Sequence, residues 1–221
     1  MFEREMIELV RSTRDMLTEE KELEITAKGR ANFVTQMDVA VQEYMRKKLH
    51  DIDDGVLLLS EEQDNSQVSD PDGRYWILDP IDGTQNFIRH FDMSAVSLAY
   101  YAQGLLQTAV VYNPFTDELF HAVRGGGAFL NDKPIHVTGN SALSQCLVAI
   151  GTSPYDRQYT EKNFPLFQNM YSRCLDIRRT GSACLDLAYV AAGRTDIYFE
   201  PVGYGCRYFA RRRSRWQSYD V

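Results

Sequence analysis

The chain has 221 residues, 44% of them hydrophobic and 12% aromatic, which is enough for the core of one large domain or two small ones. Its formal net charge of −7 and isoelectric point near 5.1 argue against nucleic acid or membrane as a main partner, although a bound divalent cation can still attract a small anionic substrate. Because it has no signal segment, no membrane-length apolar run and no CxxC pair among four cysteines, we expect a cytoplasmic protein with reduced thiols.

The first eighty residues alternate helical and extended patterns. Apolar residues at helical spacing predict an amphipathic helix over residues 2–17, and a second helix over 38–49 with Asp38 as its N-cap. Extended segments are predicted at 33–35, 56–60 and 75–78. The last two are short, apolar and followed by acidic residues, so we expect buried strands that bring carboxylates to the edge of a sheet.

The rest of the chain divides softly near residue 135. Before it, the pattern predicts a β-meander with strands at 95–101, 105–112 and 118–123, and the glycines at 125–127 form a tight turn because no Lys-Ser/Thr follows them. After it, we expect strands at 146–150 and 197–199 and helices at 163–171 and 182–192. Ser182 is the expected N-cap of the last helix, and Gly193 lies past its end.

The segment W-I-L-D-P-I-D-G-T at residues 76–84 carries the clearest chemistry. Asp79 and Asp82 lie three residues apart where a strand turns toward a helix, and Pro80 stiffens the turn. The two carboxylates and the Ile81 carbonyl can converge on one point, and Mg²⁺ prefers such all-oxygen sites. The next two residues would open a helix, whose first N–H groups favour a phosphate.

A polar turn is the alternative interpretation, because D-P and D-G are common turn signals. The pair Glu61-Glu62 weakens this alternative, since it ends a neighbouring apolar strand and adds carboxylates to the same region. Cation ligands beside an anion-binding helix start are what phosphoryl transfer requires.

Four segments, in order along the chain, resemble the inositol monophosphatase family. They read F-V-T-Q-M-D at 33–38, S-E-E at 60–62, D-P-I-D-G-T-x-N-F at 79–87 and G-S-A-x-L-D-L-A-Y-V-A-A-G-R at 181–194. The resemblance implies a mixed α/β (α+β) fold, a layered α-β-α-β-α sandwich of the sugar-phosphatase type. It implies a single domain over residues 1–201, truncated at its C-terminal edge.

The resemblance also implies a role for each matching residue. Metal ligands would be Glu61, Asp79, the Ile81 carbonyl and Asp82; the water would be activated by Glu61 and by Thr84 paired with Asp38; the substrate would be held by Gly83, Thr84, Gly181, Ser182, Ala183 and Glu200. Two or three Mg²⁺ ions, inhibition by lithium and a homodimer are further expectations. The substrate would be a small phosphorylated polyol or sugar.

The chain departs from the family after Y-F-E at 198–200. The family continues to a W-D-x-A-A-G motif whose Asp binds the second metal, whereas residues 202–221 lack it and hold five arginines within nine residues. Such a tail is either solvated or a docking segment. A frame shift after Glu200, with a small deletion, is a third hypothesis, because suitable codons for residue 202 onward read W-D-T-A-A-G-I-L in a shifted frame.

The sequence therefore predicts Mg²⁺-dependent hydrolysis of a small phosphate monoester, with inositol 1-phosphate as the first substrate to consider. Fructose 1,6-bisphosphate, histidinol phosphate and adenosine 3′,5′-bisphosphate are the alternative substrates. The rival function is a catalytically impaired metal- or phosphate-binding regulatory protein, because one predicted metal ligand is missing.

Overall fold

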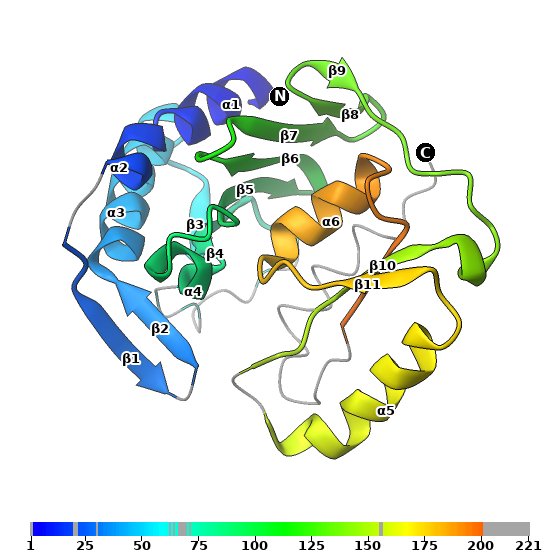
Figure 1. Cartoon of the computed structure of the whole chain (residues 1–221). Coiled ribbons are helices and arrows are strands. Elements are labelled where there is room, and N and C mark those ends of the chain that lie inside the picture. The colour runs from blue at the N-terminus through cyan, green and yellow to red at the C-terminus, as the bar shows by residue number, and fades with distance from the viewer. Residues whose placement is uncertain are drawn as a thin grey trace.

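A computed structural model gives the fold, and it describes residues 2–200 except 20, 21, 30, 62, 64, 66–69, 71, 155 and 156. Glu62 and the divergent segment 202–221 lie outside the described residues, so the predictions about them are not addressed by the fold. Figure 1 shows the elements in layers: the helices α1 to α3, a large sheet, helix α6, a small sheet and helix α5. The mixed α/β prediction is confirmed.

The helices are α1 Glu3–Arg11, α2 Arg14–Thr18, α3 Gln36–Ile52, α4 Thr84–Ile88, α5 Thr160–Tyr171 and α6 Ala183–Ala191, with short 3₁₀ turns at Leu143–Gln145 and Arg157–Tyr159. The strands are β1 Ile25–Gly29, β2 Asn32–Thr35, β3 Leu57–Ser60, β4 Tyr75–Asp82, β5 Ala95–Ala102, β6 Leu105–Asn113, β7 Glu118–Val123, β8 Gly127–Leu130, β9 Lys133–Pro134, β10 Leu147–Ile150, β11 Asp176–Arg178 and β12 Ile197–Phe199. Among these, β1, β8, β9 and β11 were not predicted.

Among the described residues, the large sheet has seven strands in chain order, from β3 to β9. Only β3 and β4 run parallel, and the remaining neighbours are antiparallel, as the predicted meander requires. The expectation that both short strands are buried on both faces holds for β4 and is wrong for β3. Leu57 is 58% exposed because β3 is the edge strand of the sheet within the described residues.

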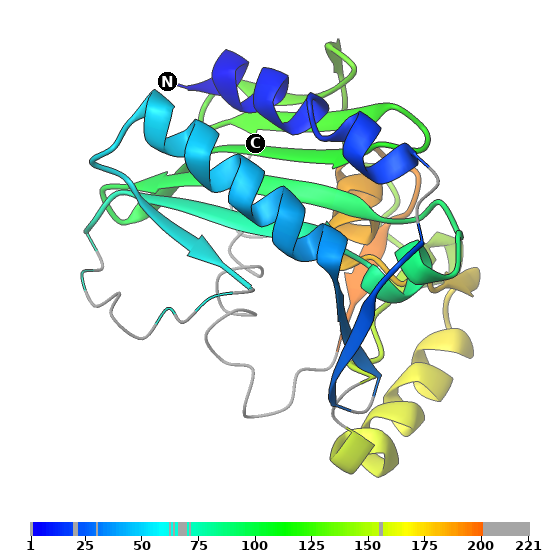
Figure 2. The same cartoon turned by 90° about the vertical axis from the view of Figure 1, so that its left-hand side faces the viewer.

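The opening helix is broken, contrary to the prediction of one helix over residues 2–17. Ser12 Oγ donates to the Leu9 carbonyl at 2.6 Å and Thr13 Oγ1 donates to the Val10 carbonyl at 2.7 Å. These side chains compete with the backbone for the carbonyls of the last turn, which ends α1 and lets α2 start in a new direction. Figure 2 shows both helices and α3 on one face of the large sheet.

The second helix starts earlier than predicted, and Thr35 rather than Asp38 is its N-cap. The Thr35 side chain accepts from the backbone N–H groups of Met37 and Asp38, and Asp38 Oδ2 accepts from the Thr35 backbone N–H at 2.7 Å. This is a capping box, in which the cap and the third helical residue satisfy each other's backbone donors. Asp38 is therefore a buried residue inside the first turn of α3.

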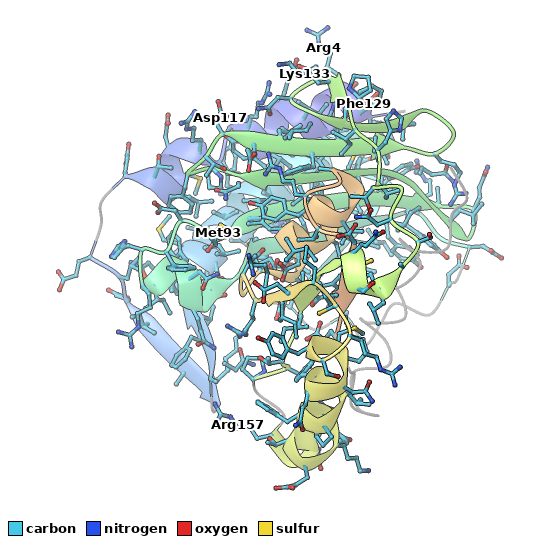
Figure 3. All side chains as sticks on the ribbon, turned by 45° about the vertical axis from the view of Figure 1, so that its right-hand side comes forward. Arg4, Met93, Asp117, Phe129, Lys133 and Arg157 are labelled. Atoms are coloured by element: carbon cyan, nitrogen blue, oxygen red, sulfur yellow. The ribbon has the colours of Figure 1, made fainter. Side chains whose placement is uncertain are left out.

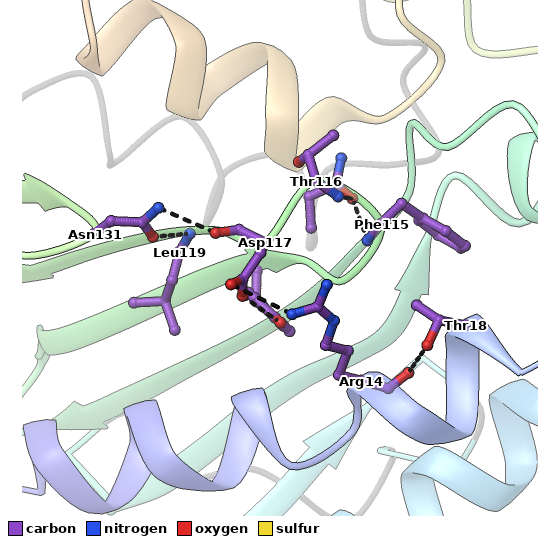
Figure 4. A network of polar contacts seen from close by, with 9 residues as sticks. Arg14, Thr18, Phe115, Thr116, Asp117, Leu119 and Asn131 are labelled. Atoms are coloured by element: carbon purple, nitrogen blue, oxygen red, sulfur yellow. Dashed lines mark hydrogen bonds and ion pairs between the residues drawn. The ribbon is translucent and has the colours of Figure 1, made fainter.

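A polar network joins α2 to the turn between β6 and β7, as Figure 4 shows. The Arg14 guanidinium lies 3.3 Å from the Asp117 carboxylate, which also accepts a hydrogen bond from the Tyr112 hydroxyl at 2.8 Å. Asn131 continues the network, because its amide donates to the Asp117 carbonyl and accepts from the Leu119 N–H. Burial, followed by the hydrogen bond to Asp117, raises the pKa of Tyr112 to about 12.

Within residues 2–200, as far as the structure describes them, the small sheet has three parallel strands in the order β11-β10-β12. Helix α5 connects β10 to β11, and α6 connects β11 to β12. The Asp196 carboxylate, just before β12, accepts from the Leu147 N–H at 2.7 Å and from the Asn140 amide at 2.8 Å. These hydrogen bonds hold β12 beside β10 and fix the segment that connects the large sheet to the small one. The predicted division near residue 135 falls in this connecting segment.

The two larger clusters of buried side chains lie on the two faces of the large sheet, and a third, smaller one joins Leu59, Tyr75 and Tyr101 of β3, β4 and β5. The largest one lies between α1, α3 and the sheet, and it includes the aromatic group of Phe2, Trp76 and Tyr100 with ring centroids 4.9–5.2 Å apart. The second joins Ala95, Val111 and Phe120 of the sheet to Leu185 and Ala188 of α6. Within the described part of the chain, none of the helices combines the length and the apolar character needed to cross a bilayer.

Candidate active site

The carboxylates of the D-P-I-D segment project from the end of β4. Pro80 has no N–H for a strand ladder, and the pairing of β4 with β5 shifts register between Asp79 and Asp82, which pair with Ser97 and Ala95. This irregularity absorbs the proline inside a strand that has neighbours on both sides. Asp79 and Asp82 are only 5% and 9% exposed, so their charges are held in a largely buried position at the strand end.

Gly83 turns the chain from β4 into α4. Its φ of 86° is in the left-handed region, which disfavours residues with a Cβ. A Cβ there would also meet the Met93 carbonyl at 3.0 Å and the Ser182 Cβ at 3.3 Å, so the space excludes a side chain. Met93, labelled in Figure 3, follows α4 and packs against the cluster that α6 contributes to.

Helix α6 starts against Asp82. The Ser182 hydroxyl donates to Asp82 Oδ2 at 2.6 Å, and the Cys184 backbone N–H donates to the same oxygen at 2.6 Å. Ser182 is the N-cap of α6, as predicted, and its oxygen also accepts from the Leu185 N–H. The side chain of Ser182 is fully buried. Its hydroxyl therefore positions Asp82. The family resemblance implied a contact of Ser182 with the substrate and did not imply this role.

The loop before α6 is held by a residue of α4. The Asn86 amide donates to the Met93 carbonyl at 2.7 Å and to the Thr180 carbonyl at 2.9 Å. Gly181, with a φ of 94°, packs so closely on Asn86 that a Cβ would lie 2.9 Å from its amide nitrogen. The Asn of the D-P-I-D-G-T-x-N-F block thus fixes Gly181 and the start of α6 beside Gly83, a role that was not predicted for it.

The structure gives Thr84 and Asp38 hydrogen-bond partners other than each other. The Thr84 hydroxyl donates to the Ile81 carbonyl at 3.1 Å. Asp38 Oδ2 accepts from the hydroxyl of Thr35 at 2.6 Å, in addition to the Thr35 N–H. The hydroxyl of Thr84 is therefore directed to its own turn, and the Ile81 carbonyl already accepts one hydrogen bond while keeping a second lone pair.

Glu61 follows the last residue of β3. Ser60 pairs with Leu78 in the parallel β3–β4 ladder. Glu61 follows Ser60 and Asp79 follows Leu78, so the backbones of Glu61 and Asp79 leave this pair side by side. Glu61 is exposed. Its carboxylate is not one of the groups that gather within 4.8 Å of each other in the described part of the chain, which are Asp79, Asp82 and Cys184. The sequence prediction named Glu61 as a ligand and did not consider the thiol.

Glu200, at the far side of the site region, is held by two hydroxyl groups. Its Oε1 accepts from Ser153 at 3.0 Å, and its Oε2 accepts from Tyr198 at 2.6 Å. Burial, followed by the charge of Glu200, raises the pKa of Tyr198, so this hydroxyl stays a donor. Gly151 packs beneath both residues, where a Cβ would lie 2.5 Å from the Tyr198 hydroxyl.

Asp186 is a buried carboxyl that the sequence did not single out. It is 2% exposed, and its Oδ1 has no hydrogen-bond partner among the described residues. Burial raises its pKa to about 7, and the nearby charge of Asp82 contributes to the same shift. The leucines and alanines around it in L-D-L-A-Y could have signalled a carboxyl on the buried face of α6, because that helix is apolar on most sides.

The donors fit a divalent cation. Asp79 and Asp82 offer two anionic oxygens within a few ångströms, and the Ile81 carbonyl lies between them in the sequence. Such oxygen donors suit Mg²⁺, which is bound in proteins by a small number of carboxylates completed by water or phosphate. Asp186 adds a third buried carboxyl, and one of its oxygens has no hydrogen-bond partner among the described residues. A nearby cation would compensate the charge of this carboxyl.

Comparison with known proteins gives a consistent picture. A model of the inositol monophosphatase family matches residues 3–206. The inositol-1-monophosphatase of Rhizobium meliloti (strain 1021) is 40% identical over 82% of this chain and 68% of its own length. The Nus factor SuhB of Escherichia coli K12 is 38% identical over 80% of this chain and 66% of its own length. The chain thus spans about two thirds of these relatives.

Solved structures share the fold. The extragenic suppressor protein suhB of Bartonella henselae superposes with a TM-score of 0.79 at 35% identity, over 89% of this chain and 76% of that one. An IMPase/NADP phosphatase solved with Mg²⁺ and phosphate has a TM-score of 0.74 at 24% identity, over 89% of this chain and 72% of that one. At that identity the second structure supports the fold alone.

Proposed function

The chain belongs to the inositol monophosphatase family, a family of metal-dependent phosphatases, and from that premise we propose that it hydrolyses a small phosphate monoester with Mg²⁺. Inositol 1-phosphate is the proposed substrate. The observation that supports the proposal most directly is the pair of buried carboxylates, Asp79 and Asp82, beside the glycine that opens α4.

Asp79, Asp82, Glu61 and the Ile81 carbonyl are proposed to hold the cation. When bound, Mg²⁺ neutralises phosphate charge and lowers the pKa of water. The protein's part is to fix the carboxylates: the shifted register of β4 projects them, and Ser182 holds Asp82 in one orientation. Because the carboxylates are pre-positioned, little reorganisation is needed when the charge of the substrate arrives.

The phosphate is proposed to lie at the N–H groups of Gly83 and Thr84. These amides start α4, and the first N–H groups of a helix have no acceptor within it. Asp38 and Glu61 are proposed to orient the attacking water. That role for Asp38 requires Thr84 to exchange its hydrogen bond to the Ile81 carbonyl for one to Asp38 when substrate binds.

The polyol is proposed to lie between the start of α6 and Glu200. Gly181 and Ala183 would offer backbone groups to its hydroxyls, while the hydroxyl of Ser182 remains on Asp82. Glu200 would accept from a further hydroxyl, with Ser153 and Tyr198 fixing its two oxygens. Two or three Mg²⁺ ions, sensitivity to lithium, a homodimer and a cytoplasmic location complete the proposal, and all four come from the family.

A regulatory or binding protein is the second candidate. The W-D motif that supplies a metal ligand in the family is missing from residues 201–221. A relative of 38% identity carries the name of a Nus factor, a designation that is not enzymatic. Under this hypothesis, the chain would bind a divalent cation without releasing phosphate.

Phosphate release by the 221-residue chain from inositol 1-phosphate and from the three alternative substrates tests the proposal. We expect release that requires Mg²⁺ and falls at least about a hundredfold in Asp79→Asn, because a metal contributes several kcal/mol to transition-state stabilisation. Asp51→Asn, an exposed position on α3, is the matched control and should retain activity. Release that is indifferent to Mg²⁺ or to Asp79→Asn would contradict the proposal, and Mg²⁺ binding without release would favour the second candidate.

A further inference from the structure

The group of donors at the end of β4 contains a sulfur atom. One ligand atom from each of Asp79, Asp82 and Cys184 lies within 4.8 Å of the other two. Magnesium is a hard cation that prefers oxygen, whereas thiolates select softer cations such as Zn²⁺ or Cd²⁺. The family resemblance assigned only oxygen ligands here, so Cys184 gives this position a chemistry that the proposed function does not use.

The thiol is held in place by the start of α6. Ser182 caps the helix and Cys184 is its second residue, with a backbone N–H that donates to Asp82 Oδ2. The same carboxylate therefore fixes the hydroxyl of the cap and the backbone of the cysteine. A side chain that projects from such a fixed backbone has little freedom to leave the group, so the three donors are preorganised.

A second observation points to a cation close to Asp82. Asp186 follows Cys184 by two residues on α6, is 2% exposed, and has an oxygen without a hydrogen-bond partner in the described part of the chain. A buried carboxyl oxygen without a partner is costly unless a positive charge or a proton compensates it. Asp186 interacts electrostatically with Asp82, so a divalent cation held by Asp79 and Asp82 would also offset the charge of this carboxyl.

We propose that Cys184 joins Asp79 and Asp82 to form a mixed sulfur–oxygen site that binds a thiophilic divalent cation of the Zn²⁺ or Cd²⁺ class and competes with Mg²⁺. On binding, the S–H bond breaks, a sulfur–metal bond forms and the proton passes to solvent, with no change in oxidation state. The inference rests on the proposed function in one respect: that function identifies Mg²⁺ as the cation that Zn²⁺ or Cd²⁺ would displace. The cation would inhibit phosphate release by occupying a position that Mg²⁺ needs.

Cadmium titration of the metal-free 221-residue chain tests the site by its thiolate-to-metal absorption in the near ultraviolet. We expect a saturable band in the wild type and its loss in Cys184→Ala, with apparent affinity for Cd²⁺ weakened at least about tenfold, since one of few ligands is removed. Alanine keeps the backbone N–H that donates to Asp82, and Cys184→Ser provides a second variant of nearly the same size. Cys174→Ala, whose thiol lies against the carbonyls of Tyr171 and Asp176, is the control and should keep the band.

Phosphate release measured on the same samples separates this inference from the proposed function. A band that depends on Cys184 supports the site even if no variant releases phosphate, in which case the proposed function fails alone. A band of unchanged intensity and affinity in Cys184→Ala overturns the site, whether or not the wild type is active. Where the wild type is active, Cd²⁺ should inhibit it more strongly than it inhibits Cys184→Ser, and equal inhibition contradicts competition at this position.

Discussion

The large and small sheets contribute to the candidate site in different ways. In the large sheet, strands that follow one another in the chain also lie side by side, and one strand end supplies Asp79 and Asp82. In the small sheet, parallel strands require helical crossovers, and α6 brings Ser182 to Asp82 across 100 residues of sequence. The position of the two carboxylates is therefore set by one local segment, whereas the orientation of Asp82 depends on the docking of a distant helix.

The two regions also differ in burial. The large cluster of buried side chains lies on the large sheet, while within the described residues α5 buries only Phe167. Phe164, Leu166 and Tyr171 of α5 are 46–62% exposed. We therefore expect the large sheet to dominate the free energy of unfolding, and the small sheet to be the part whose changes are tolerated.

The largest expected difference concerns activity. Asp82→Ala removes a proposed metal ligand and the acceptor of both Ser182 and the Cys184 N–H, so we expect phosphate release to fall at least about a hundredfold. Glu200→Gln, in the small-sheet region, keeps most of the shape and should cost only about five- to tenfold, as one hydrogen bond is weakened. Initial rates at saturating Mg²⁺ check this order, and equal losses would break the comparison.

The next difference concerns stability, tested with the same change in both regions. Leu98→Ala in β5, where the side chain is 1% exposed, should lower the free energy of unfolding by about 3 kcal/mol through lost burial and a cavity. Leu166→Ala in α5, where the side chain is 46% exposed, should cost less than about 1 kcal/mol. Urea unfolding of the two variants measures both, and a larger effect at Leu166 would contradict the assignment of the core.

A smaller effect tests the bond that joins the regions. Ser182→Ala removes the N-cap of α6 and the hydroxyl on Asp82, so we expect a loss of about 1–2 kcal/mol in stability and a higher Mg²⁺ concentration at half-maximal activity. Ser172→Ala, at the exposed end of α5, is the control and should change neither quantity. A stability loss without any change in Mg²⁺ dependence would mean that Ser182 caps the helix without positioning Asp82.

The smallest effect is a pH dependence within the small-sheet region. Hydrogen bonds, first from Thr138 and then from the Leu147 N–H and Asn140, lower the pKa of Asp196 below its ordinary value of 3.8, against the opposing effect of desolvation. A lowered folded-state pKa means that Asp196 stabilises the fold above pH 3.8 and that this contribution is lost as pH falls through the folded pKa. Urea midpoints of wild type and Asp196→Asn should therefore differ at pH 7 and converge below pH 3.8, and a constant difference would contradict the assignment.

The sequence alone determined the layered α/β class, most strands of the meander, the cap of α6 and the family. It could do so because hydrophobic period, turn residues and the D-P-I-D-G-T block are local signals, readable within a few residues. The same signals failed where local patterns compete: Ser12 and Thr13 break a continuous apolar helix pattern, and Thr35 rather than Asp38 caps α3.

The assembly of the site depends on contacts between segments that lie far apart in the sequence. The docking of α6 on β4 directs the Ser182 hydroxyl to Asp82, brings the Cys184 thiol beside two carboxylates and buries Asp186. No periodicity or motif encodes these contacts, because they join segments about 100 residues apart and depend on the packing of a whole sheet face. Neighbouring residues in the sequence determine the local backbone conformation of a residue. The partners of its side chain are determined by which helix and sheet surfaces pack against each other, as α6 does against β4.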